Sequence, residues 1–178
     1  YNAAEDLLTV HSSTQVPHQT RLYLGQGFGI SENHIQVIAN DVGGGFGAKL
    51  TVDCEYLPVL GSILTGKPVR WFESRSEWIH ASFAARDYHT RSRAAFKRDG
   101  TLIAMDTEIL ADVGCDSAER ACGLGMPING GNYALGPYCC DVYRTKVRCV
   151  VTNKAPYSAY RGYGKDLANM LIERVLDQ

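Results

Sequence analysis

The residues best suited to bind a ligand are clustered in positions 43–47, which read Gly-Gly-Gly-Phe-Gly. These four glycines follow an apolar, strand-like run at 35–39. Glycines let a backbone approach a ligand closely and leave N–H groups that can surround an anion. A phosphate-binding P-loop is excluded, because the lysine does not follow the last glycine directly and Leu50 stands where Mg²⁺ would need Ser or Thr.

Two interpretations of this glycine segment remain open from spacing alone. Gly43, Gly45 and Ala48 satisfy the pattern G-x-G-x-x-A of dinucleotide-binding folds, and Glu73 would end the next strand. This hypothesis predicts a nicotinamide-binding module. The alternative is a close-packed corner of glycines that binds no ligand.

Two further segments could contribute to a site. Residues 159–164 read Ala-Tyr-Arg-Gly-Tyr-Gly, in which Arg161 could direct its guanidinium at an anionic or metal–oxo group. The other interpretation is a surface loop whose arginine pairs with a helix end. Gln15 follows Ser-Thr and carries an amide that both donates and accepts hydrogen bonds, in a ligand site or in a local cap.

Composition narrows the class of protein. The chain has 178 residues with 18 Lys or Arg against 19 Asp or Glu, and 45% of its residues are hydrophobic. A net charge of −1 argues against an electrostatic nucleic-acid binder, and the apolar content argues against disorder. No apolar run approaches the roughly 20 residues of a membrane span, so we expect neither a nucleic-acid nor a membrane partner.

The six cysteines do not follow a metal-binding pattern. None forms a C-x-x-C pair, and neither zinc nor iron–sulfur spacing is met. We interpret them as thiols of a reducing cytoplasm. They are Cys54, Cys115, Cys122, Cys139, Cys140 and Cys149.

The pattern of apolar residues predicts an α+β fold with mixed strands and helices. The expected order is strand 6–10, helix 17–24, strand 35–39, helix 52–64, strand 69–72, a hairpin of strands 88–96 and 101–110, loop 123–136, strand 142–151 and a final helix after Asp166. The basic residues between positions 70 and 98 are interpreted as a solvated strand face. The start at Tyr1 and a last helix that ends without a stop signal lead us to expect a fragment of a longer protein.

Taken together, the three segments resemble one family in their order and spacing. The matching stretches are 13–15, 43–49 and 152–164, with further similarity at 66–70, 75–77 and 136–138. They resemble the molybdopterin-binding large subunit of the xanthine dehydrogenase, aldehyde oxidoreductase and carbon monoxide dehydrogenase family, the molybdenum hydroxylases. The resemblance covers essentially all of residues 1–178, which would be an incomplete part of the molybdopterin-binding domain of that subunit.

The resemblance implies a molybdenum–molybdopterin cofactor and assigns residues to it. Gln15 is similar to the glutamine beside the apical oxo ligand of molybdenum. Phe46 and Gly47 resemble the backbone contacts to the oxygen ligands of the metal. Gly44 and Gly45 resemble the residues near the pterin dithiolene.

The resemblance also assigns positions around the substrate. Arg161 is similar to the arginine of the inner site loop, and Tyr163 to an aromatic residue that lines the substrate pocket and can stack on a planar ring. Purine-oxidising members carry glutamate and arginine where this chain has Leu50 and Asn129, so a purine is not expected. Copper-dependent carbon monoxide dehydrogenases carry cysteine at the position of Gly162, so carbon monoxide oxidation is not expected either.

The implied reaction is hydroxylation of an aldehyde, aromatic or N-heterocyclic carbon with oxygen from water. Electrons would leave through iron–sulfur clusters and FAD on partner subunits or domains, and the pterin could be in its cytosine dinucleotide form. The glutamate base of the family is expected downstream of this chain, so no catalytic residue is assigned, Glu173 included. Residues 1–178 alone are expected to be inactive, and a cofactor-free homologue of the same fold remains an alternative.

Overall fold

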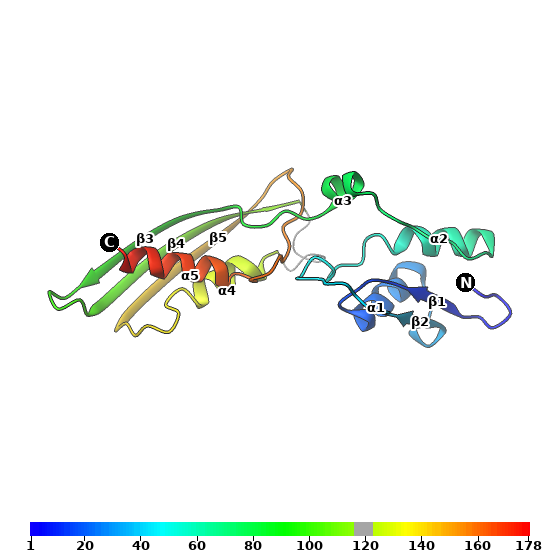
Figure 1. The fold of residues 1–178 in the computed structure, drawn as a ribbon, viewed down its shortest axis with the longest axis horizontal. Coiled ribbons are helices and arrows are strands. Elements are labelled where there is room, and N and C mark those ends of the chain that lie inside the picture. Colours follow the sequence, from blue (N-terminus) through cyan, green and yellow to red (C-terminus); the bar gives the residue numbers. More distant parts are fainter. Residues whose placement is uncertain (116–122) are drawn as a thin grey trace. The chain divides into compact units, whose positions relative to one another are not determined.

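The computed structural model describes residues 1–115 and 123–178, which form two compact units, Tyr1–Ala81 and Ser82–Gln178 (Figure 1). Each unit has its own cluster of buried apolar side chains. The composition of the sequence shows no linker at the boundary between them.

The first unit begins with two short parallel strands joined by a helix. β1 (Leu8–His11) pairs with β2 (Ile35–Ile38), and α1 (Pro17–Phe28) and the short 3₁₀ helix η1 (Glu32–His34) connect them. Parallel strands require such a crossover. The expected end of the helix at residue 24 is wrong, because the helix continues through Gly25, where a side chain would lie 2.9 Å from the carbonyl oxygen of Ile30.

The rest of the first unit contains α2 (Tyr56–Thr65) and α3 (Arg75–Ala81). Gly66 ends α2 in the left-handed conformation, as the sequence predicts. The expected buried strand at 69–72 is wrong, because residues 66–74 form no strand and the side chain of Phe72 is 77% exposed.

The helix α3 begins with a capping box that was not predicted. The backbone N–H of Ser74 donates to Glu77 Oε2 at 2.8 Å, and the N–H of Glu77 donates to Ser74 Oγ at 3.2 Å. These hydrogen bonds lower the pKa of Glu77. The pattern Ser-x-x-Glu was a signal for this helix in the sequence.

The second unit is a three-stranded sheet with two helices. β3 (Tyr88–Phe96) and β4 (Leu102–Gly114) form the predicted hairpin, and β5 (Val142–Val151) lies parallel to β4. α4 (Gly125–Asn132) and α5 (Lys165–Leu176) lie along the sheet (Figure 1). The sheet and the helices enclose a core of Leu102, Met105, Ile109, Ala134, Leu167, Leu171 and Ile172. This mixture of elements confirms the α+β prediction.

The prediction of a loop over residues 123–136 is wrong, because Gly125–Asn132 form the helix α4. Two glycines allow this helix to pack closely: a Cβ on Gly130 would lie 2.7 Å from a methyl carbon of Leu167, and one on Gly131 would lie 2.9 Å from Thr145 Oγ1. A glycine costs a helix about 1 kcal/mol relative to alanine. Tertiary packing therefore outweighs the low helix propensity of this stretch.

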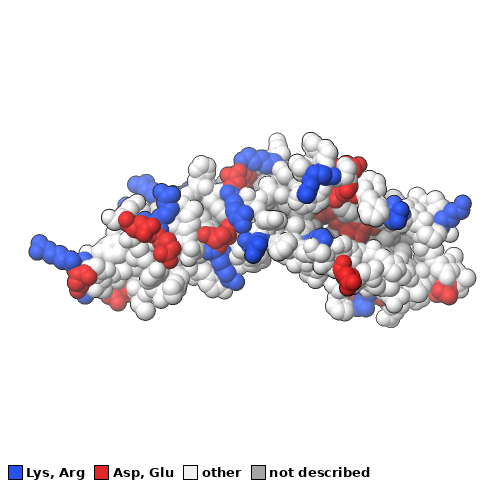
Figure 2. All heavy atoms as spheres, in the orientation of Figure 1, with Lys and Arg blue, Asp and Glu red and all other residues white. Residues whose placement is uncertain are grey.

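Charges of both signs are interspersed over the surface of the protein. Figure 2 shows this for the face in view, which includes α4 and α5 of the second unit. On the open face of the sheet, the charges follow the pairing of the strands. Acidic residues on β4 lie opposite basic residues on both neighbouring strands, with Asp106 between Arg93 and Arg144 and Glu108 between Arg91 and Lys146. Within the described residues, no helix is both long enough and apolar enough to cross a membrane.

The described cysteines form no disulfide in the structure. Cys54, Cys115, Cys139, Cys140 and Cys149 are free thiols, and Cys122 lies outside the described residues. Burial and the neighbouring Glu73 raise the pKa of Cys54 to about 12, so this thiol stays protonated and unreactive at neutral pH.

Candidate functional site

Gln15 holds the glycine segment, defined as residues 43–47, through its side-chain oxygen. Gln15 Oε1 accepts the N–H of Gly47 at 2.9 Å and the N–H of Lys49 at 3.3 Å. The backbone N–H of Gln15 donates in return to the carbonyl oxygen of Lys49 at 3.0 Å. Both side-chain partners are donors, so the oxygen must face them and the amide NH₂ is the end that can donate to a ligand.

The conformation of the glycine segment depends on its residue types. A Cβ on Gly45 would overlap the amide of Gln15, so only glycine permits this close approach. Phe46 has a φ of 52°, in the left-handed region that non-glycine residues seldom adopt. Its ring lies over Gly44 and its side chain is 54% exposed.

Residues before α1 and after the glycine segment contact one another and, together with the glycine segment, form one corner of the first unit. Lys49 Nζ donates to Ser13 Oγ at 2.7 Å, which ties the end of the glycine segment to the Ser-Thr-Gln sequence. Thr14 is buried, and its hydroxyl accepts the N–H of Val16 at 3.1 Å at the start of α1. Leu50 follows directly, half-buried, with its N–H donating to the carbonyl oxygen of Gly47 at 3.3 Å. Ser13 and Lys49 were not predicted as individual site residues.

The donors of this corner fit a ligand rich in anionic oxygen. Gln15 presents an amide NH₂, and a Cβ on Gly43 would meet no atom within 4 Å, so the backbone there is open to a ligand. In the described part of the chain, no group of three or more His, Cys, Asp or Glu could hold a metal ion directly.

Residues 35–74 are all described, and they lack the elements that the dinucleotide-binding hypothesis requires around the glycine segment. Residues 46–49 form a turn and the next helix, α2, starts only at Tyr56, so no helix N-terminus follows the glycines. Glu73 lies in residues 66–74, which are all described and contain no strand. The strand–glycine–helix–strand order of that fold is absent there.

The arginine loop, defined as residues 159–164, lies in the second unit and has an unusual backbone. Arg161 and Tyr163 have φ angles of 42° and 51°, and the intervening and following glycines have φ angles of 149° and 88°. Left-handed conformations at non-glycine residues persist only where surrounding contacts impose them, and they gather at functional sites. Among the described residues only five non-glycine positions show positive φ, and Phe46, Arg161 and Tyr163 are three of them.

Helix α4 packs against the end of the arginine loop. A Cβ on Gly164 would overlap the carbonyl oxygen of Met126 and lie 3.1 Å from Asn129 Cβ. One on Gly125 would lie 2.5 Å from the hydroxyl oxygen of Tyr163. The structure therefore brings Asn129 on α4 close to the arginine loop, which carries Tyr163.

The chain leading into the arginine loop is anchored by Asp112 at the end of β4. Lys154 Nζ lies 2.8 Å from Asp112 Oδ2 and 2.7 Å from Asp87 Oδ2. Thr152 Oγ1 and the N–H of Gly114 both donate to Asp112 Oδ1, at 2.7 and 3.0 Å. The hydrogen bond from Lys154, followed by those from Thr152 and Gly114, lowers the pKa of Asp112 to about 2. The same carboxylates raise the pKa of Lys154.

Arg86 is the main residue of this region that was not predicted. Its guanidinium contacts Asp166 and two carbonyl oxygens of the arginine loop. In the sequence it belongs to the basic stretch interpreted as a solvated strand face, and only its place before β3 sets it apart. Sequence spacing could not reveal its partners, since they lie 74 to 80 residues away.

The predicted residues fall into two groups, one in each unit. Those in the first unit are Gln15, Gly44, Gly45, Phe46, Gly47 and Leu50, all on the corner at the glycine segment. Those in the second unit are Asn129, Arg161 and Tyr163, on α4 and the arginine loop.

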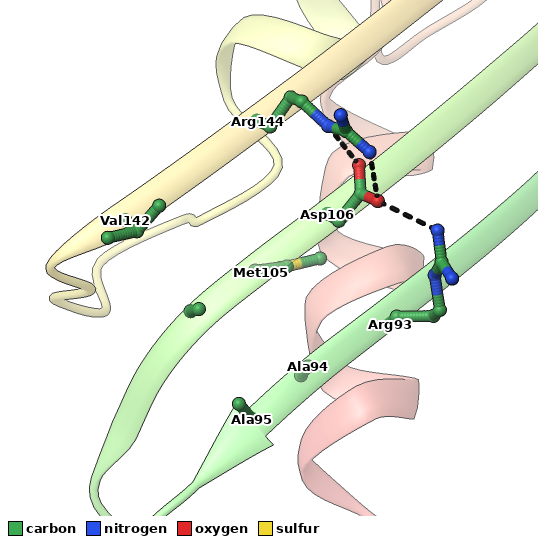
Figure 3. A pocket seen from close by; sticks show the side chains of 8 residues that line it. Arg93, Ala94, Ala95, Met105, Asp106, Val142 and Arg144 are labelled. Atoms are coloured by element: carbon green, nitrogen blue, oxygen red, sulfur yellow. Dashed lines mark hydrogen bonds and ion pairs between the residues drawn. The ribbon is translucent and has the colours of Figure 1, made fainter.

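A shallow pocket on the open face of the sheet does not coincide with either group. It has a volume of about 450 Å³ and lies around Asp106, which is bound by Arg144 Nη2 at 2.6 Å and Arg93 Nη2 at 3.1 Å (Figure 3). Its other lining residues are Ala94, Ala95, Ala104, Met105 and Val142. The arginines hold the pKa of Asp106 below its usual value, so the carboxylate is an ion-pair partner and not a proton donor.

Comparison with known proteins identifies the family of the chain. The family model of the molybdopterin cofactor-binding domain matches residues 1–178. The chain is 38% identical over 175 residues to the carbon monoxide dehydrogenase large chain of Afipia carboxidovorans, covering 96% of this chain and 21% of that protein. It is 29% identical over 173 residues to the nicotinate dehydrogenase large molybdopterin subunit of Eubacterium barkeri, covering 97% and 40%.

The fold is also similar to solved structures. That of quinoline 2-oxidoreductase from Pseudomonas putida 86 matches with a TM-score of 0.84 and 29% identity, over 98% of this chain and 25% of that one. The chain belongs to the molybdopterin cofactor-binding family of the molybdenum hydroxylases. It spans about a fifth of the length of the carbon monoxide dehydrogenase large chains that it matches.

Proposed function

We propose that residues 1–178 are part of the large subunit of a molybdenum hydroxylase and contribute two groups of residues to its cofactor and substrate sites. The first group is Gln15 with the glycine segment, and the second is the arginine loop with Asn129 on α4. The family match supports the class of cofactor. The roles of individual residues are those that the family resemblance implies, and the contacts of Gln15 and of the arginine loop are consistent with them.

The observation that carries the proposal is the orientation of the Gln15 amide. Its oxygen is engaged by the N–H groups of Gly47 and Lys49, so its NH₂ is directed to act as a donor. A terminal oxygen ligand of a metal centre accepts such a hydrogen bond, whereas it cannot accept one from a carboxylate. The amide is therefore fixed in the orientation that the proposed role demands.

When bound, the molybdenum cofactor supplies a Lewis acid and a redox centre for hydroxylation with oxygen from water. The residues of this chain would bind the cofactor and the substrate and orient them. Gln15 and the backbone of the glycine segment would hold oxygen ligands of the metal, and the ring of Phe46 in the same segment is exposed. Arg161 supplies a guanidinium for an anionic group, and Tyr163 supplies an aromatic face for a planar substrate.

The substrate proposed for the whole enzyme is an aldehyde, an aromatic ring or an N-heterocycle. Leu50 and Asn129 offer neither carboxylate nor guanidinium, which leaves a purine without the charged anchors implied by the family resemblance. Gly162 provides no sulfur for a copper ion. The relatives named for carbon monoxide and nicotinate show that similar chains serve different substrates.

The remaining parts of the enzyme are proposed to lie outside these residues. They include the glutamate that acts as base, further contacts to the pterin, and iron–sulfur and FAD subunits that remove electrons. The protein is proposed to work in the cytoplasm, with the pterin in either its simple or its cytosine dinucleotide form.

The test is to purify the whole polypeptide that contains this sequence, with its partner subunits, and to measure molybdenum and substrate turnover. We expect close to one molybdenum per polypeptide and dye reduction with aromatic aldehydes or N-heterocycles, but not with hypoxanthine or carbon monoxide. A preparation without molybdenum that binds NAD(P) at micromolar concentration would overturn the proposal in favour of a nicotinamide-binding module. A preparation that binds neither would indicate a cofactor-free homologue.

A further inference from the structure

Arg86 connects three parts of the arginine loop and its flanking helix. Its Nε donates to Asp166 Oδ2 at 2.6 Å, and its Nη2 donates to the carbonyl oxygens of Tyr160 and Arg161, both at 2.9 Å. The guanidinium also lies 5.9 Å from the centre of the Tyr160 ring. The carboxylate of Asp166 raises the pKa of Arg86, so the guanidinium remains charged.

The two carbonyl groups belong to the peptide planes on either side of the Arg161 Cα atom. When both planes are fixed, the φ and ψ angles of Arg161 are fixed as well. Arg161 has a φ of 42°, a conformation that a non-glycine residue does not keep without support. Hydrogen bonds from a charged donor are stronger than neutral ones, so Arg86 supplies that support.

Arg86 is itself held in place by buried neighbours. Its backbone N–H donates at 3.0 Å to the hydroxyl of Tyr157, whose side chain is 1% exposed. Next to it, the N–H of Ala84 donates to the carbonyl oxygen of Pro156, and the N–H of Ser158 donates to the carbonyl oxygen of Ala84. The guanidinium therefore starts from a fixed backbone position.

Asp166 has a second contact that restricts the loop. It lies in the first turn of α5, where a carboxylate is favourable, and its Oδ1 would be 2.7 Å from a Cβ placed on Gly162. With Asp166 held by Arg86, the space beside position 162 is filled. The pair thus requires glycine immediately after Arg161.

We infer that Arg86 and Asp166 are positioning residues, which hold Arg161 in the left-handed conformation that it uses in the site and require glycine at position 162. This inference rests on the proposed function of the arginine loop. Neither residue needs to touch the cofactor or the substrate.

The test compares Arg86→Lys and Arg86→Gln in the whole enzyme. Lysine keeps the charge but cannot make the two-sided contact of a planar guanidinium, and glutamine loses the charge. Both are non-glycine residues, so the backbone cost at the φ of 68° of Arg86 stays the same. The matched control is Arg93→Lys, which changes another Arg–Asp pair of the same unit, on the open face of the sheet.

The expected result has two parts. Hydrogen exchange of residues 157–166 in the apoprotein becomes faster in both Arg86 variants and stays unchanged in Arg93→Lys. In the loaded enzyme, kcat falls about tenfold or more in Arg86→Lys while KM changes less than about threefold, because the loss concerns orientation and not uniform binding.

The outcomes separate this inference from the proposed function. Unchanged exchange in the Arg86 variants would overturn the inference, and so would faster exchange with unchanged kcat, since that result assigns only a structural role. If the wild-type enzyme contains no molybdenum and hydroxylates nothing, the proposed function fails. The exchange measurement then still decides whether Arg86 holds the arginine loop.

Discussion

The glycine segment and the arginine loop present the same problem, a left-handed backbone at a bulky residue, and hold it in different ways. At the glycine segment the support is a neutral amide, since Gln15 accepts the N–H groups that follow Phe46. At the arginine loop the support is a charged pair, Arg86 and Asp166.

The two regions differ in whether one residue both holds the backbone and is proposed to contact the ligand. Gln15 holds the backbone with its oxygen and is proposed to contact the cofactor with its NH₂, so both roles change together when it is replaced. In the second unit, Arg86 holds the loop and Arg161 is proposed to act in the site. Substitutions can therefore separate positioning from binding at the arginine loop more easily than at the glycine segment.

The largest effect is expected for Gly164→Ala at the end of the arginine loop. The new Cβ would overlap the carbonyl oxygen of Met126 at a φ of 88°, and α4 would have to move. We expect a loss of about 3 to 5 kcal/mol in the unfolding free energy of the second unit. Hydrogen exchange in β4 and β5 at increasing urea measures it.

The matched control for that substitution is Gly100→Ala. Gly100 has a nearly equal φ of 87°, and a Cβ there would meet no atom within 4 Å. Only the conformational cost of about 1 kcal/mol is expected. Equal losses of unfolding free energy in the two variants would show that α4 does not pack closely against Gly164.

Two substitutions of Gln15 compare its support of the backbone through Oε1 with the proposed donor role of its NH₂. Gln15→Glu keeps an oxygen for the N–H groups of Gly47 and Lys49 but removes the NH₂ donor, whereas Gln15→Leu removes both. We expect about 10- to 100-fold weaker retention of molybdenum in both variants, a typical cost of losing a contact to a metal's ligands. Metal analysis after dialysis of the whole enzyme measures it, and full occupancy in Gln15→Glu would rule out the donor role.

A smaller effect is expected for Gly45→Ala. The added methyl group would displace the amide of Gln15, whose side chain is flexible and exposed, so we expect a loss of about 1 kcal/mol in the first unit. Gly43→Ala is the control, because its Cβ would lie in open space. Thermal unfolding of the apoprotein should place Gly45→Ala below the wild type and leave Gly43→Ala unchanged.

The smallest effect concerns acid stability at the anchor of the arginine loop. The pKa of Asp112 is lowered from 3.8 to about 2 in the folded state, so its contribution is present above pH 3.8 and is lost as the pH falls toward 2. The wild type should therefore be more stable than Asp112→Asn at neutral pH, and this difference should shrink below pH 4. A difference that is constant with pH would show that the network with Lys154 does not depend on the charge of Asp112.

The sequence predicted the parts of the molecule whose side chains alternate or recur over a long stretch. β5 was predicted with its observed bounds, because Arg144, Lys146 and Arg148 alternate along this strand with less exposed residues. Helix α4 was missed because its glycines serve contacts with α5 and β5 that no local pattern encodes. The prediction of a buried strand at 69–72 was wrong, because the apolar side chains of this segment are exposed in the structure.

The residues of the candidate site were accessible from the sequence only where a motif carried them. Gln15 and Gly47 are 32 residues apart in the sequence, and only the family resemblance indicated that they belong to one site. Arg86 belongs to no motif, and its role depends on contacts with residues 74 to 80 positions away. Such support is visible only once the chain is folded.

Whether Gln15 contacts the cofactor is tested by a crystal structure of the whole enzyme with anomalous scattering measured at the molybdenum edge. We predict a molybdenum site with an oxygen ligand within hydrogen-bond distance of Gln15 Nε2, while Gln15 Oε1 still accepts the N–H groups of Gly47 and Lys49. A molybdenum site away from Gln15, or a Gln15 amide turned away from the metal's ligands, would contradict it.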